Sequence, residues 1–103
     1  MTFKPDIIRK IQTDFDDKSS EVFKMLNKAI EAKYFKADRV IRCIVFLANG
    51  SIDELNKLIR VATNDTRDVM FWAEYEKLNG DFNYKRLRDF NKAFEESTNN
   101  IKE

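Results

Sequence analysis

The carboxylate-rich stretch DFDDKSSE, residues 14–21, is the first place where residue types and spacing could support chemistry. Its acids at positions 14, 16 and 17 begin like a calcium-binding loop, which coordinates the ion through oxygen atoms. The pattern then fails, because the sixth loop position needs Gly and is Ser19, and the twelfth needs Glu and is Met25. We therefore expect no metal site, and a solvated connection between two helices instead.

Catalytic residue types are scarce in this chain. It contains no His, which removes the commonest general base and every Ser-His or Cys-His nucleophile. Both glycines follow Asn and stand alone, so there is no glycine-rich phosphate loop. Cys43 lies in an apolar run, where a thiol is usually inert. We expect no cofactor and no enzyme, with carboxylate-based hydrolysis as the remaining catalytic alternative.

The stretch DTRDVMFWAEY, residues 65–75, has the composition of a binding surface. Trp, Tyr and Arg are enriched at the energetic centres of protein interfaces. The predicted partner-binding residues are Arg67, Trp72, Tyr75 and Tyr34.

A structural alternative accounts for the same residues. Asp65 or Thr66 can cap a helix whose residues Val69, Trp72 and Ala73 share one face. A second apolar face, with Phe71 and Tyr75, would make this a central, buried helix.

Basic residues near the C-terminal end suggest a different partner. On a helix starting near Asn83, the side chains of Lys85, Arg88 and Lys92 would form one stripe with Arg86 beside them, and such a stripe can follow phosphate groups. Acidic neighbours dilute it, and the net charge of +1 provides no long-range attraction to nucleic acid. Nucleic-acid binding is therefore the alternative to protein binding, and a solvated charged face accounts for the same pattern.

The elements that would position these residues are helical. Hydrophobic residues form 43% of the 103-residue chain, charged residues 36%, and there are only two Gly and one Pro, which favours a densely charged all-α domain. We expect a compact bundle of five to six short helices in a single domain, residues 1–96, with a polar, frayed tail at 97–103. Apolar residues at helical spacing predict helices beginning at Pro5, Ser19 or Ser20, Asp38, Ser51, Asp65 or Thr66, and near Asn83.

Three of these helices carry further signals. The run from Asp38 is apolar around nearly its whole circumference, which predicts a central helix, with a buried strand as the competing interpretation. Asn49-Gly50 should end it. Ser51 and Glu54 fit a capping box for the next helix. Before the last helix, Phe82 and Leu87 fit a hydrophobic staple.

A weak internal repeat is also present. LNKAI at 26–30 recurs as LNKLI at 55–59, and Asn-Gly at 49–50 recurs at 79–80. Two stacked helix hairpins would explain this spacing.

The segment from Asp38 to Tyr75, about a third of the chain, resembles small uncharacterised bacterial helical proteins in which an Arg-Asp-hydrophobic stretch opens a late helix. The resemblance transfers no activity or site; some such proteins resemble the immunity partners of bacterial toxins, which act only by binding. The chain has no apolar run of ~20 residues and no apolar signal-peptide core at its start. We expect a cytoplasmic bacterial protein-protein interaction module, of adaptor or toxin-immunity type, with a homodimer as one arrangement.

Overall fold

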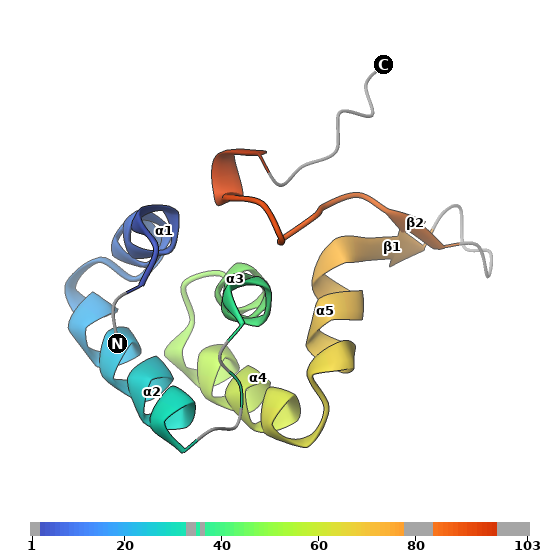
Figure 1. Ribbon diagram of the computed structural model, residues 1–103. Helices are drawn as coiled ribbons and strands as arrows, with labels where there is room; N and C mark the ends of the chain where they lie inside the picture. Colours follow the sequence, from blue (N-terminus) through green and yellow to red (C-terminus); the bar gives the residue numbers. More distant parts are fainter. Residues whose placement is uncertain (1–2, 33–34, 36, 78–83, 97–103) are drawn as a thin grey trace.

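The computed structural model describes residues 3–32, 35, 37–77 and 84–96. Within these residues it confirms an all-α fold with five α-helices, to which a short two-stranded ribbon is attached (Figure 1). The elements are α1 (Pro5–Phe15), a 3₁₀ turn η1 (Asp16–Lys18), α2 (Ser19–Glu31), α3 (Asp38–Ala48), α4 (Ile52–Asn64), α5 (Thr66–Glu74), β1 (Tyr75–Lys77), β2 (Tyr84–Arg86) and a 3₁₀ turn η2 (Phe94–Glu96).

Helix α3 is the centre of the fold, as its sequence predicts. Figure 1 shows it nearly end-on, with α1, α4 and α5 arranged around it. Its side chains are buried on almost every side, including Ile41, Cys43, Ile44 and Val45, each with no exposed surface. This run forms a helix, so the competing interpretation as a buried strand is wrong. Neighbouring helices cover it on nearly all sides, which explains why it is apolar around its circumference.

The turn between α3 and α4 follows its sequence signals. Asn49 and Gly50 both have positive φ angles, 48° and 84°, which end α3. A Cβ atom on Gly50 would lie 2.7 Å from the carbonyl oxygen of Asp14, so this turn also needs Gly for a close approach to the end of α1. The hydroxyl oxygen of Ser51 then accepts the Glu54 N–H at 3.2 Å, which confirms the Ser51 half of the predicted capping box. The Ser51 N–H donates to the Ala48 carbonyl oxygen at 3.0 Å instead of to Glu54.

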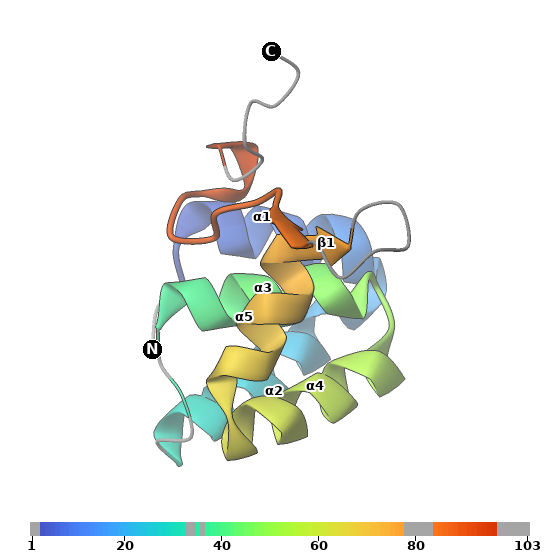
Figure 2. The ribbon, with the colours of Figure 1, turned by 90° about the vertical axis from the view of Figure 1, so that its right-hand side faces the viewer.

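The predicted sixth helix is wrong. Residues 84–86 form strand β2, which pairs antiparallel with β1 so that Tyr75 lies opposite Arg86 and Lys77 opposite Tyr84. After β2 the chain crosses the end of α5 and passes over α3 toward α1 (Figure 2). We call residues 84–96 the C-terminal segment. Asn83 and Phe82, and with Phe82 the predicted staple, lie outside the described residues.

The duplicated helix hairpin is not confirmed. Helix α5 ends at Glu74 and continues as a strand, and α3 packs mainly against α4 and α5. Asn79-Gly80 and the tail at 97–103 lie outside the described residues. In the described part of the chain, no helix is long and apolar enough to cross a membrane.

Candidate binding surfaces and the buried ion-pair network

The ring of Phe71 on α5 contacts two aromatic rings of the ribbon, those of Tyr75 and Tyr84. Together with the exposed Trp72, which follows Phe71 in α5, we call these residues the aromatic face. The Phe71 ring stacks on Tyr75 with centroids 5.2 Å apart, and meets Tyr84 edge-on at 5.0 Å. Phe71 is 41% exposed, and Trp72 and Tyr84 are each 49% exposed. Pairing of β1 with β2 brings Tyr84 to this surface. The predicted sixth helix would have placed Tyr84 elsewhere.

Helix α5 has one buried face rather than two. Val69 and Ala73 are fully buried, whereas Trp72, which was expected on their face, is half exposed. The prediction of a central helix with two packed faces is therefore wrong for Phe71 and Trp72. Of the other predicted partner-binding residues, Tyr75 is partly buried in the aromatic face, and Tyr34 lies outside the described residues.

Arg67 lies one turn before Phe71 at the start of α5, and its side chain is 83% exposed. Its guanidinium donates to both carboxylate oxygens of Asp65, at 3.0 and 2.9 Å. Asp65 also accepts the backbone N–H of Arg67, as the predicted helix cap. These bonds lower the pKa of the Asp65 carboxyl, so the pair stays ionised at neutral pH.

A buried carboxylate at the end of α5 was not predicted. Glu74 has no exposed surface, and its oxygens accept from Arg39 of α3 at 2.6 and 3.0 Å, from Arg86 of β2 at 3.0 Å, and from the Phe90 N–H at 3.0 Å. Burial by itself raises the pKa of Glu74, but the hydrogen bonds from Arg39 and Phe90 outweigh it, and the pKa is lowered.

A second buried ion pair joins the first helix to the same region. Arg42 of α3 donates to Asp6 of α1 at 2.8 and 3.1 Å, and to the Phe90 carbonyl oxygen at 3.0 Å. Asp6 also accepts the Phe94 N–H at 3.1 Å. Burial by itself raises the pKa of Asp6, but the hydrogen bonds from Arg42 and Phe94 outweigh this effect, and the pKa is lowered. Together, the two ion pairs fix the C-terminal segment to α1, α3 and α5.

The predicted nucleic-acid-binding residues do not form a helical stripe. Arg86 bonds to Glu74 and Asp89 within the fold. Arg88 donates to the Ala73 carbonyl oxygen at 2.6 Å and to Glu76 at 2.8 Å, and its guanidinium lies 4.6 Å from the Phe46 ring centroid. Lys85 and Lys92 are exposed. Two of the four cations are therefore occupied in holding the C-terminal segment in place.

Cys43 has a structural environment. Its side chain is fully buried in α3. Burial, together with the negative charge of Glu74, raises the pKa of the thiol to about 12, so the nucleophilic thiolate is scarce at neutral pH. Among the described residues, no three His, Cys, Asp or Glu side chains are grouped so that they could hold a metal ion.

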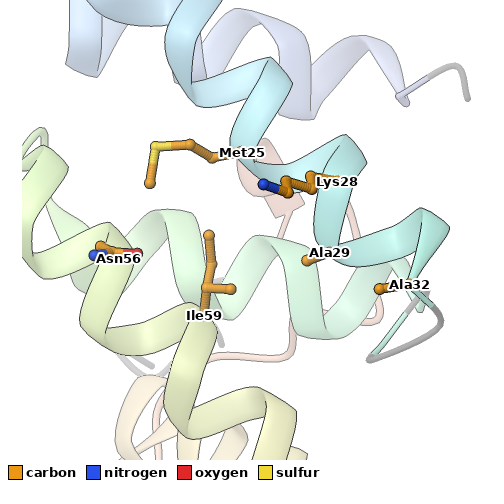
Figure 3. A pocket seen from close by; sticks show the side chains of 6 residues that line it. All are labelled: Met25, Lys28, Ala29, Ala32, Asn56 and Ile59. Atoms are coloured by element: carbon orange, nitrogen blue, oxygen red, sulfur yellow. The ribbon is translucent and has the colours of Figure 1, made fainter.

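Hollows on the surface of the described residues include the following two. One, of about 540 Å³, lies at the start of α1 and α3, where the charged side chains Asp6, Arg39 and Arg42 already belong to the two ion pairs. The other is an apolar groove of about 330 Å³ between α2 and α4, which we call the α2–α4 groove (Figure 3). It is lined by Met25, Lys28, Ala29, Ala32, Asn56 and Ile59.

Comparison of the chain with protein-family models, with curated proteins and with solved structures found no match. Its function must therefore be inferred from the surfaces described above.

Proposed function

We propose that this chain is a non-catalytic protein-protein interaction module, an adaptor or immunity-type protein of the cytoplasm, which binds its partner through the aromatic face. The observation that carries the proposal is the exposure of Phe71, Trp72 and Tyr84. Among the described residues, the other large apolar side chains are buried or partly buried. With roughly 150–250 Å² per aromatic side chain, about half of each exposed, these three present on the order of 300 Å². The largest apolar patch of a typical monomer is of this size, about 300–600 Å², and is often functional.

The aromatic side chains are also held in position. The ring of Phe71 contacts those of Tyr75 and Tyr84, so these side chains lose little conformational freedom when a partner covers them. Aromatic residues with few rotatable bonds are favoured as interface anchors for this reason. The face therefore offers a partner preformed apolar contacts.

The charges around the aromatic face favour a protein partner over nucleic acid. Arg67, one turn before Phe71, is paired with Asp65. Asp68 adds a negative charge beside Arg67, whereas Glu76 and Lys85 pair on the other side of the ribbon from Tyr75 and Tyr84. A face with balanced charges lacks the excess of cations that binding to phosphate groups requires, whereas a polar rim of both signs around an apolar centre is usual for protein interfaces.

The test is affinity capture from native cell lysate with the tagged protein, in the presence and absence of nuclease. Wild type is compared with Trp72→Ala and Phe71→Ala, and with Arg60→Ala as a control, because Arg60 is an exposed residue of α4. We expect a stoichiometric protein that survives nuclease, is lost with the α5 variants and is kept by the control.

Two results would contradict the proposal. Recovery of nucleic acid alone, abolished by nuclease, would transfer the function to the basic residues Lys85 and Lys92. Equal capture by the wild type and both α5 variants would show that the partner binds elsewhere. Circular dichroism of each variant ensures that a lost partner reflects a lost contact and not a lost fold.

A further inference from the structure

The α2–α4 groove is a second surface that the proposed function does not use. Helices α2 and α4 each contain 13 residues and form its walls. Its base is open because Ala29 of α2 and Ala32, the residue after this helix, have short side chains that leave space that larger residues would fill. Figure 3 shows side chains from the two helices facing each other across this space.

Most of the lining of the groove is apolar and adaptable. Met25 and Ile59 lie on opposite walls, and both are partly buried hydrophobic residues packed against the core. The thioether of Met adapts to apolar surfaces of different shapes. An apolar chain could therefore occupy the groove with little rearrangement of the fold.

The charge in the lining of the groove is positive. Among the residues that line it, Lys28 is the one charged side chain, and Asn56 is the other polar one. In the described part of the chain, the Lys28 amine has no carboxylate within 4.0 Å, in contrast to Lys57, which pairs with Glu54 on the outer side of α4. An unpaired ammonium at the edge of an apolar groove favours an anionic ligand.

We infer that the α2–α4 groove binds a small amphiphile with an apolar chain and one anionic head group, such as a carboxylate. The apolar chain contacts Met25, Ala29 and Ile59, and the head group lies at the amine of Lys28. A volume of about 330 Å³ is at the lower end of the range for small-molecule sites, near 300 Å³. With roughly 30 Å³ for each non-hydrogen atom, similar to a water molecule, it accommodates about eleven such atoms, enough for an eight-carbon chain that ends in a carboxylate.

The test uses three probes with the same chain and different head groups: octanoate, octanol and octyltrimethylammonium. Methyl NMR signals of Met25 and Ile59 report binding, and titrations give each dissociation constant. We expect octanoate to bind at least about tenfold more tightly than octyltrimethylammonium, with octanol between them. Lys28→Glu should reverse the order of the two charged probes, because the edge of the groove then carries a negative charge.

Two further variants test whether the probes bind in the groove or elsewhere on the surface. Ala32→Phe fills the open space at the exposed residue that follows α2 and should weaken binding of all three probes. Lys24→Glu makes the same charge change one turn earlier on α2, at an exposed residue outside the lining, and should leave the order of affinities unchanged.

Equal affinities for the three probes, or no methyl shifts with any of them, would overturn the inference. Methyl shifts seen only on addition of the protein captured through the aromatic face would also overturn it, and would assign the groove to that partner. This inference is independent of the proposed function, because Trp72→Ala should abolish capture while leaving octanoate binding intact.

Discussion

The backbone N–H of Phe90 donates to the carboxylate of Glu74 at 3.0 Å, and both residues are completely buried. A non-helical segment is thus attached to the end of α5 by an ionised group in the interior. Arg39 and Arg86 neutralise that charge, and Arg42 binds the carbonyl oxygen of Phe90 on the other side. This arrangement satisfies the buried polar groups of the C-terminal segment without a helix.

Replacing Glu74 should strongly destabilise the fold. In Glu74→Gln, Arg39 and Arg86 keep their positive charges next to a neutral amide that cannot compensate them. Loss of one partner from a buried ion pair costs about 3 kcal/mol or more in free energy of unfolding. Urea unfolding followed by circular dichroism measures the change. The matched variant Glu76→Gln, at a more than half-exposed carboxylate paired with Arg88, should cost less than about 1 kcal/mol. Similar decreases in the free energy of unfolding for Glu74→Gln and Glu76→Gln would contradict the importance assigned to Glu74.

Acid should destabilise the protein through the same carboxylates. The pKa of Glu74 lies below its ordinary value of 4.5 in the folded protein, and that of Asp6 lies below 3.8. The unfolded chain therefore binds protons first as the pH falls, so the stabilisation present at neutral pH is lost progressively below about pH 4.5. Free energies of unfolding measured from pH 7 to pH 2.5 should show this decrease. Asp6→Asn should make the dependence shallower, and an unchanged slope would count against the role of Asp6.

The two faces of α5 should respond differently to truncation. Trp72→Ala removes a half-exposed side chain and should cost about 1–2 kcal/mol in free energy of unfolding, because only on the order of 100 Å² of its apolar surface is buried. Val69→Ala opens a cavity in the core and should cost about 2 kcal/mol, although it removes far fewer atoms. Thermal melts of both variants provide the comparison. A loss of about 3–5 kcal/mol for Trp72→Ala would mean that its indole is a core residue after all.

Cys43 should resist modification in the native state. Its thiol is buried and its pKa is raised to about 12, so both access and thiolate formation are unfavourable at pH 8. Iodoacetamide labelling followed by mass spectrometry should show little product in buffer and rapid, complete labelling in concentrated urea. Fast labelling of the folded protein would require an opening of α3 that the structure does not contain.

Local signals in the sequence predict the first five helices well. Pro5 begins α1, Ser51 and Asp65 cap α4 and α5, and Asn49-Gly50 ends α3, as their backbone chemistry requires. These features depend on neighbouring residues, so they can be recognised without knowing the fold.

The C-terminal segment was mispredicted because its conformation depends on distant residues. Leu87, Phe90 and Phe94 have helical spacing, yet the N–H groups of Leu87 and Arg88 donate to the Glu74 carbonyl oxygen instead of closing a helical turn. Glu74 itself follows Ala73 in an amphipathic helix, where a Glu is usually exposed. Nothing local indicates that two arginines converge on it. The aromatic face was predicted in part, through Trp72 and Tyr75, but Tyr84 reaches it only through strand pairing.

The bond from the Phe94 N–H to Asp6 connects positions 88 residues apart in the chain. During synthesis on a ribosome, α1, α3 and α5 emerge before the residues that complete their ion pairs. Arg42 can meet Asp6 early, but Glu74 remains without Arg86 and Phe90 until the last part of the domain has been made. Until residues 86–90 have emerged, the nascent chain therefore lacks groups that complete the hydrogen bonding of this central carboxylate, and their arrival allows the fold to close.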